Sequence, residues 1–267
     1  TSSNATADVT LGTIADVDGL TSMTVTSVAG DITIGALATD AAANNAEGLA
    51  TVTLSATGSS TIALGNIFAD SVADSGAGTS DLAMTINATT ETGSSIDFDS
   101  IANDEGSIAI TASGNGDFDF GTATNNFKAA TLTADLSGAS ATNLINVTLV
   151  SGASTVTLGD STGADTIVVG DTGQGVVSIT NFEIGASGDV ISIDQSLSAA
   201  QDFNGVNLAA TAAGSTDVAE ISSSTTSAQT DGDIFILTGA SFATTALALT
   251  AVLAAGSRDI TFAASIA

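Results

Sequence analysis

The 267-residue chain has no cysteine, histidine, tryptophan, tyrosine or proline, and only two basic residues, Lys128 and Arg258. Without cysteine or histidine it cannot build a zinc site, a thiol nucleophile, a Ser-His-Asp triad or the usual haem ligation. Two basic residues are too few to clamp a phosphate or to cover a nucleic-acid backbone. A glycosidase needs only two carboxylates, but the aromatic and basic residues that normally orient a sugar are missing. We therefore expect no enzyme activity and no nucleic-acid partner.

Long apolar runs are also missing. The longest candidate extends from Ala246 to Ala255, which is well short of the roughly 18 residues that suggest a membrane-spanning helix. We therefore expect no membrane insertion. The 29 acidic residues give a formal charge of −27, which is unusual for a cytosolic protein. Calcium-rich extracellular water would neutralise this charge better, so the composition favours an extracellular location.

Short segments in which apolar and small polar residues alternate recur along the chain. They are often spaced about 9–15 residues apart, and alternation with period two places one face inward and one toward water. We therefore expect a mainly β protein whose body is either a parallel β-solenoid or an antiparallel β-sandwich. The segments lie at 9–11, 23–25, 32–34, 52–54, 62–64, 84–86, 108–110, 118–120, 147–149, 156–158, 167–169 and 177–179.

A glycine that precedes an apolar residue by four positions favours the solenoid. A turn glycine takes a positive φ, and the apolar residue stacks on its neighbour in the next coil. In a chain rich in glycine, threonine and valine, such matches also arise by chance. The pattern occurs at Gly58, Gly114, Gly152, Gly163 and Gly173.

The C-terminal part differs from the repeating body. Residues 234–237 and 259–262 read as strands, and Ser241 is a suitable helix N-cap. Apolar residues then follow at helical spacing as far as Gly256, which suits a helix stop. The pattern predicts a small C-terminal strand-helix-strand cap.

The acidic residues are mostly aspartate, and glutamate occurs only at positions 47, 91, 105, 183 and 220. A solvated surface would tolerate either acid, whereas aspartate suits turns in which a short carboxylate lies beside backbone carbonyls. Calcium sites have this geometry and use oxygen ligands alone. Since softer transition metals prefer nitrogen or sulfur ligands, the sequence favours Ca²⁺.

The segment from Gly159 to Gly175 carries the sharpest motif. Gly163, Asp165 and Ile167 match the fourth, sixth and eighth positions of the nonapeptide G-G-x-G-x-D-x-U-x. The segment therefore resembles the calcium-binding repeats-in-toxin (RTX) proteins. Residues 177–194, which include Asp189, look like the segment that ends such arrays. Residues 233–239 and the following Ala/Leu stretch look like the tail of secreted RTX-type proteins, particularly bacterial surface-layer proteins.

This resemblance implies an RTX-like β-roll, calcium-dependent folding after type I secretion, and, as in surface layers, two-dimensional assembly on the cell. Because about one and a half repeats are present, one calcium site is expected rather than a long array. The chain divides into a β-rich body at 1–150, RTX-like calcium-binding coils at 151–195 and a C-terminal α/β cap at 196–267. The expected metal ligands in the coils are Asp160, Asp165, Asp171 and Asp189.

Pairs of aspartates at i and i+2 supply further candidate ligands. On a strand such residues lie on one face, about 6.5–7 Å apart. A bridging Ca²⁺ would relieve their repulsion, although an exposed pair is also compatible with a simple solvated surface. The pairs are Asp16/Asp18, Asp97/Asp99, Asp117/Asp119 and Asp231/Asp233, and the densest cluster combines Asp97 and Asp99 with Asp104 and Glu105.

These observations indicate an extracellular structural protein that binds Ca²⁺ and self-assembles into a surface layer or a filamentous matrix. Few aromatic residues argue against a single hot-spot partner site and favour broad self-association. The alternative is an RTX-like adhesin that binds a cell-surface polysaccharide or another cell. An ice-binding solenoid is a third possibility, but the threonine pairs 24/26, 51/53 and 131/133 look too irregular along the sequence to favour it.

Overall fold

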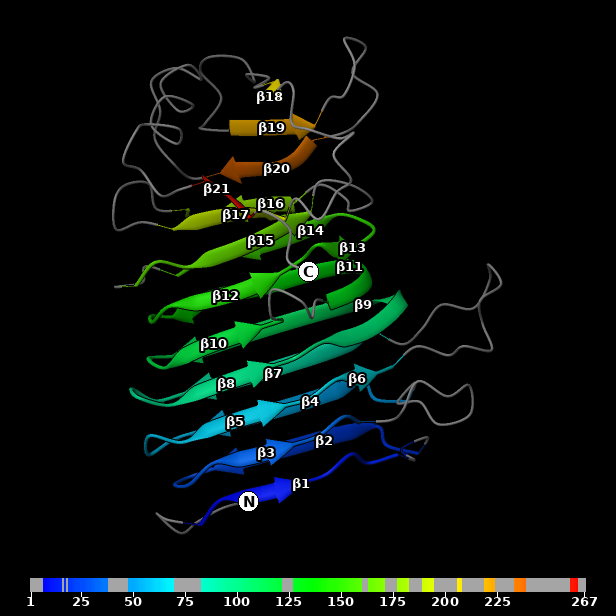
Figure 1. Cartoon of the computed structure of the whole chain (residues 1–267), viewed down its shortest axis with the longest axis vertical. Coiled ribbons are helices and arrows are strands. Elements are labelled where there is room, and N and C mark those ends of the chain that lie inside the picture. Colours follow the sequence, from blue (N-terminus) through cyan, green and yellow to red (C-terminus); the bar gives the residue numbers. More distant parts are fainter. Residues whose placement is uncertain are drawn as a thin grey trace.

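The structure is a computed structural model that is mainly β, with parallel strands in two sheets (Figure 1). It describes residues 7–15, 17, 19–37, 48–69, 83–121, 127–159, 163–170, 177–182 and 189–194, together with strands at 206–207, 219–223, 233–238 and 260–263. These described residues contain no helix. None of them therefore belongs to a helix long and apolar enough to cross a membrane.

We call the sheet that contains β1 sheet I. In this sheet the order of the strands in space is the same as their order along the chain, beginning at the N-terminal end of the stack (Figure 1). Each neighbouring pair is parallel. The strands are β1 (Val9–Leu11), β3 (Ile32–Ile34), β5 (Thr61–Leu64), β8 (Ser95–Phe98), β10 (Asp117–Phe120), β12 (Asn143–Asn146), β15 (Thr166–Gly170), β17 (Val190–Asp194) and β21 (Ile260–Ala263).

Sheet II is built from the strands that alternate with those of sheet I along the chain. Only its last strands, β18 to β20, pair antiparallel among the described residues. The short strands β6 (Ile67–Phe68) and β13 (Leu149–Val150) pair at its side with β9 and β11. In spatial order the others are β2 (Ser22–Ser27), β4 (Thr51–Ala56), β7 (Met84–Thr90), β9 (Ile101–Gly114), β11 (Phe127–Ala139), β14 (Ser154–Thr157), β16 (Val177–Thr180), β20 (Asp233–Thr238), β19 (Ala219–Ser223) and β18 (Val206–Asn207).

The alternation of side chains builds one core between the two sheets. In β7, buried and exposed residues alternate along the whole strand. The register of the strand pairs places large apolar residues beside one another. Leu64, Phe98 and Phe120, for example, are paired on three successive strands of sheet I. All three are buried. The period-two prediction is therefore confirmed, and the parallel pairing from β1 to β17 shows that the antiparallel sandwich alternative was wrong for these strands.

Two of the expected turn glycines take left-handed backbone conformations. Gly58 has φ +65° and Gly114 has φ +122°. A Cβ at Gly58 would lie 2.1 Å from the carbonyl oxygen of Val28, on the neighbouring turn. Both glycines lie where the chain passes from sheet II to sheet I, so the prediction of a positive φ is confirmed at these positions. It is wrong at Gly152 and Gly163, which have no positive φ, and Gly173 lies outside the described residues.

One predicted strand, 147–149, is wrong. Strand β12 ends at Asn146 and β13 begins at Leu149, so Val147 and Thr148 belong to neither strand. The Oδ1 atom of Asn146 accepts hydrogen bonds from the backbone N–H and the hydroxyl of Thr148, at 3.1 and 2.9 Å. These side-chain bonds, together with the hydrogen bond from the N–H of Val150 to the carbonyl of Val147 at 3.1 Å, turn the backbone between the two strands.

The C-terminal expectations are covered only in part. Strands β20 and β21 coincide with the two strands expected around 234–237 and 259–262. The helix expected after Ser241 lies outside the described residues. The strand stack itself runs without interruption across residues 150 and 151, since β11 pairs with β9 on one side and with β14 on the other.

Candidate functional site

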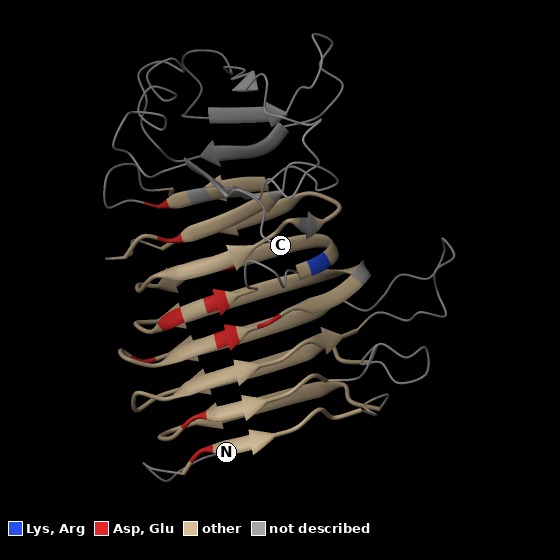
Figure 2. Ribbon diagram, in the orientation of Figure 1, with Lys and Arg blue, Asp and Glu red and all other residues tan. Residues whose placement is uncertain are grey.

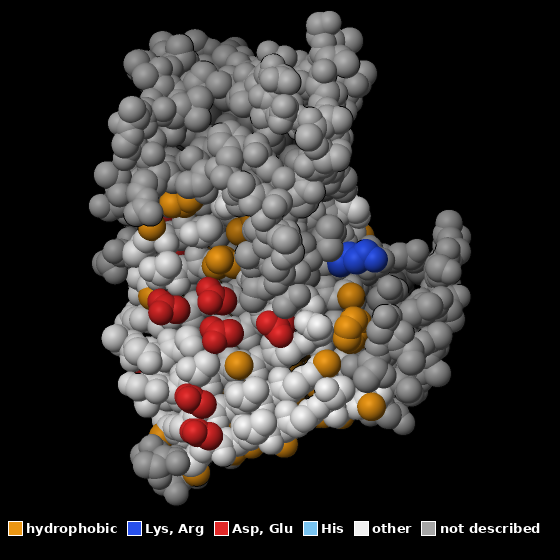
Figure 3. Space-filling model, in the orientation of Figure 1, with side chains coloured by type: hydrophobic (Ala, Val, Ile, Leu, Met, Phe, Trp, Pro, Cys, Tyr) orange, Lys and Arg blue, Asp and Glu red, His pale blue; other side chains and the backbone are white. Residues whose placement is uncertain are grey.

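Acidic side chains gather on the outward face of sheet I. Figure 2 marks acidic residues on β8 and β10, and Figure 3 shows acidic atoms clustered on this side of the molecule. Asp97 on β8 pairs directly with Asp119 on β10, and Asp117 pairs with Ser95. The structure therefore brings together three predicted ligands, Asp97, Asp117 and Asp119, from strands whose sequences are about 20 residues apart.

Crowding changes the protonation of this cluster. Burial, and then the charges of Asp119 and Asp117, raise the pKa of Asp97 from 3.8 to about 6. The pKa of Asp119 is also raised, first by burial and then by the Asp117 charge. Each cause disfavours the charged carboxylate. At neutral pH the cluster is therefore strained by its own negative charge.

We expect Asp97→Asn to increase the free energy of unfolding at pH 7 by roughly 1 kcal/mol, a value discounted because the carboxyl is partly exposed to solvent. The raised pKa means that the folded protein holds this proton more tightly than the unfolded chain. The parent protein therefore keeps the associated stability below pH 3.8 and loses it as pH rises through about 6. Urea unfolding across this pH range should show the decline in the parent and not in the variant.

Asp135→Asn is the matched control for this measurement. The hydroxyl and backbone N–H of Ser137 donate to Oδ1 of Asp135 at 2.6 and 3.0 Å, and they lower the pKa of that carboxyl. A lowered pKa gives stability at neutral pH that is lost as pH falls. Asp135→Asn should therefore be destabilising at pH 7. Equal effects of the two variants would contradict the crowding of Asp97.

A second polar group lies inside the protein, between the sheets. On sheet I the buried inward column runs through Ile62, Ile96 and Phe118 and then becomes polar at Asn143, which pairs with Phe118. Asp165 lies one residue before β15, and Asp189 lies one residue before β17. They continue the column because the strands pair at the next position, Leu144 with Thr166 and Thr166 with Val190. We call Asn143, Asp165 and Asp189 the polar ladder. Each of the three residues is only 1% exposed.

Hydrogen bonds connect the ladder from strand to strand. The backbone N–H and the Nδ2 amide of Asn143 donate to Oδ1 of Asp165, at 2.9 and 2.8 Å. The N–H of Asp165 donates to Oδ1 of Asp189 at 3.0 Å. The Oδ1 atom of Asn143 is buried and accepts no hydrogen bond from the described residues. The carboxyl groups of Asp165 and Asp189 are thus buried next to each other, and the side chain of Asn143 contacts Asp165 through its Nδ2 atom.

This donor set can hold a hard cation. All three side chains offer oxygen, which Ca²⁺ prefers, and Ca²⁺ also accepts backbone carbonyls and water as further ligands. Two neighbouring buried carboxylates are costly unless a positive charge or hydrogen bonds compensate them. Asn143 adds a buried amide oxygen on the neighbouring strand, while its Nδ2 atom is the one that bonds Asp165. The residues of the ladder therefore fit a calcium ion.

Sequence reasoning identified Asp165 and Asp189 but missed Asn143. Asn143 lies 22 residues before Asp165, and Asp165 lies 24 before Asp189. The near-constant spacing of polar residues at the start of a strand or directly before it was the signal that would have found Asn143. It is visible only once the strand starts are known, because asparagine is otherwise common in turns.

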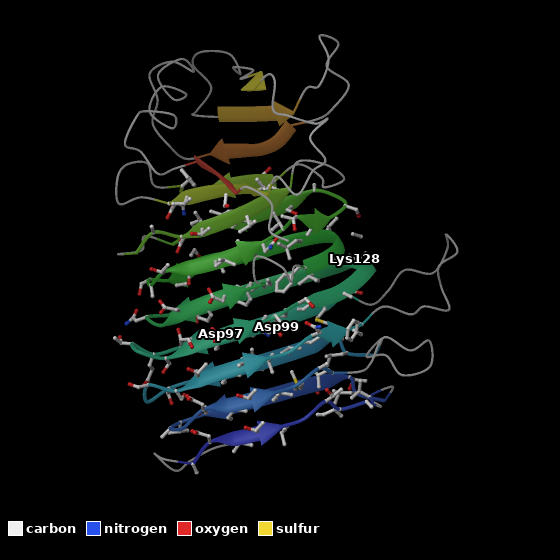
Figure 4. All side chains as sticks on the ribbon, in the orientation of Figure 1. Asp97, Asp99 and Lys128 are labelled. Carbon is white, nitrogen blue, oxygen red and sulfur yellow. The ribbon has the colours of Figure 1, made fainter. Side chains whose placement is uncertain are left out.

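The other predicted ligands lie elsewhere. Asp99 is exposed just after β8, and Figure 4 labels it beside Asp97. Asp104 belongs to β9 of sheet II, and its side chain lies outside the described residues, as do Asp160 and Asp171. Within the part of the chain that the structure describes, no three or more acidic side chains approach closely enough to hold a metal by themselves.

Comparison with protein-family models, with curated proteins and with solved structures finds no match to this chain. The function must therefore be argued from the geometry of its own residues.

Proposed function

We propose that this chain is an extracellular structural protein that folds as a parallel β-solenoid, binds Ca²⁺ at the polar ladder and self-assembles into layers or filaments. The alternation of consecutive strands between two parallel sheets supports the solenoid. Each turn of such a coil rests only on its neighbours, so an ion that joins adjacent coils stabilises the stack where it binds.

The observation that carries the proposal is the burial of Asp165 and Asp189 next to each other. Both are 1% exposed, and they directly precede adjacent strands of one sheet. Folding removes both carboxylates from water, and a divalent cation compensates the two charges at once. Bound Ca²⁺ would thus link the coils that contain β12, β15 and β17.

The N-terminal end of the stack supports self-assembly. The exposed large hydrophobic side chains of the described residues are Leu11, Ile14 and Val28. They belong to the first coil, where β1 and β2 each pair with a neighbour on one side only within the described residues. Apolar side chains beside an unpaired parallel edge are typical of surfaces that accept another strand. Ca²⁺ binding and screening would reduce the repulsion between chains of charge −27.

Thermal unfolding with and without Ca²⁺ tests the ion site. Ligand at about 100 times its dissociation constant stabilises a folded protein by about 2.7 kcal/mol, which for a chain of this size is a rise in Tm of roughly 5–10 °C. We expect this rise in the parent chain when millimolar Ca²⁺ replaces a chelator. Asp165→Asn should lose it, while remaining at least as stable as the parent in chelator because one buried charge is gone.

Asp99→Asn is the matched control, since Asp99 is an exposed aspartate directly after β8 of the same sheet. It should keep the full response to Ca²⁺. Light scattering and negative-stain microscopy on the same samples follow assembly, which we expect in Ca²⁺ and not in chelator. An unchanged Tm response in Asp165→Asn would contradict the ladder as the ion site. A parent chain that stays monomeric in Ca²⁺ would contradict the structural role.

A further inference from the structure

The outward face of sheet II carries a two-dimensional array of hydroxyl groups. Register aligns two columns of outward residues across seven consecutive strands, from β2 to β16. Most positions are threonine. One column consists of Ser22, Thr51, Thr85, Ala109, Thr133, Thr155 and Ser178, and the other of Thr24, Thr53, Asn87, Thr111, Asp135, Thr157 and Thr180. We call these residues the hydroxyl array.

The backbone sets the spacing of this array. Neighbouring strands lie about 4.7–4.9 Å apart, and outward residues along one strand repeat every 6.5–7 Å or so. Threonine is stiff at χ1, so its hydroxyl and methyl groups hold defined positions on a hydrogen-bonded strand. The strands beneath are anchored by fully buried residues such as Val52, Ile86 and Leu132. The array is therefore a rigid grid rather than a set of mobile side chains.

Charge distinguishes this face from the opposite one. Asp135 is the only charged side chain in the two columns, although the chain carries 29 acidic residues. The acidic cluster of Asp97, Asp117 and Asp119 lies instead on sheet I, and Figure 2 shows the acidic residues there. Lys128 is exposed on β11 outside these columns. Two almost neutral columns on so acidic a molecule match a partner that is itself uncharged.

We propose that the hydroxyl array adsorbs to the surface of ice crystals. The array repeats in two directions, and a partner that repeats in two directions can be contacted by every strand in the same way. The oxygen rows on the prism faces of hexagonal ice have spacings close to both repeats of the array. Hydroxyl groups join the hydrogen-bonded lattice, while the methyl groups order the water between them. This activity goes beyond assembly and does not depend on the polar ladder.

Two other occupants fit the face less well. Polysaccharide recognition without Trp or Tyr lacks the aromatic platforms on which sugar rings stack, and the two columns contain no aromatic residue. A second copy would bury roughly 400 Å² per chain on an array of this strand spacing, about half of what a stable interface of standard size needs. The minimum contact area of a protein–protein interface does not apply to ice, because an ice surface extends beyond the array on every side.

Thermal hysteresis of the full chain in millimolar Ca²⁺ tests the proposal, with ice-crystal shape recorded in the same osmometer. We expect a gap between melting and freezing points and faceted crystals. Thr133→Lys places a long charged side chain in the middle of the array and should abolish most of this gap. Thr33→Lys is the matched control, because Thr33 is equally exposed on β3 of sheet I. It adds the same charge and should keep the gap.

Absence of a gap in the parent chain, or equal gaps in the two lysine variants, would overturn the proposal. If Thr133→Lys instead loses self-association or glycan binding while the parent shows no gap, the face belongs to a second copy or to a polysaccharide. Circular dichroism and Tm of all three proteins establish that the lysine variants are folded. If Asp165→Asn kept the Tm response to Ca²⁺, the polar ladder would be ruled out as the ion site, but the expected thermal hysteresis would not change. The two proposals can therefore be refuted independently.

Discussion

We expect the Phe120→Ala variant to lose about 3–5 kcal/mol of unfolding free energy, because truncating a buried phenylalanine removes apolar burial and leaves a cavity. Phe120 is fully buried and lies at the centre of an aromatic cluster. Its ring centroid is 5.6 Å from that of Phe98, 5.8 Å from that of Phe118 and 6.3 Å from that of Phe127. The loss is a large fraction of the 5–15 kcal/mol that stabilises a typical domain.

The cluster joins the two sheets, which explains the size of this effect. Phe98, Phe118 and Phe120 come from sheet I, while Phe127 begins β11 of sheet II. Since Phe120 contacts all three of the others, no single neighbour can move in to fill its space. Urea denaturation followed by circular dichroism measures the loss. Phe68→Ala is the control: Phe68 is only partly buried at the core edge, so its truncation should be distinctly less destabilising. Equal losses would contradict the central role of Phe120.

Gly114→Ala should be destabilising by about 3 kcal/mol, through backbone strain and a steric clash together. The residue has φ +122°, which L-residues with a side chain rarely adopt. An added Cβ would lie 1.9 Å from the carbonyl oxygen of Thr90 and 2.9 Å from its nitrogen. These are backbone atoms of the paired strand β7, so they cannot move without disturbing the pairing of β7 with β9.

Gly19→Ala is the control for this substitution. A Cβ at Gly19 would meet no atom within 4 Å, so its Tm should stay within the small range of a neutral surface change. Differential scanning calorimetry of the two variants separates a general effect of replacing glycine from the local clash. A Gly114→Ala protein as stable as Gly19→Ala would show that the turn relaxes around the methyl group.

The local features of the fold were predictable from the sequence. The alternation at Ile32–Ile34 or Phe118–Phe120 is a property of a few adjacent residues, and each segment became a strand. Gly58 and Gly114 were recognised as turn residues, because a positive φ is a local requirement. The segment 147–149 failed for a local reason as well, since one asparagine side chain competed with strand pairing there.

The candidate site was predictable only in its residue types. Asp165 was expected as a ligand within a turn motif, yet it lies buried in a column that runs through Phe118 and Asn143. Asp97 and Asp119 were expected in separate i, i+2 pairs, and they turned out to face each other across strands. Which carboxylates meet depends on register, and register depends on the lengths of all the intervening turns.

By itself, the sequence determined that this protein is a β structure without thiol, imidazole or cationic chemistry, because composition and period-two alternation act within single segments. Only the tertiary structure decided which residues stand side by side. It stacked threonines from seven segments into one grid with a single charged side chain, collected aspartates on the opposite sheet and buried two more in the ladder. From β1 to β17, parallel pairing joins residues between 21 and 34 positions apart, as in Lys128 with Leu149 and Thr51 with Thr85. No local pattern specifies such a neighbour.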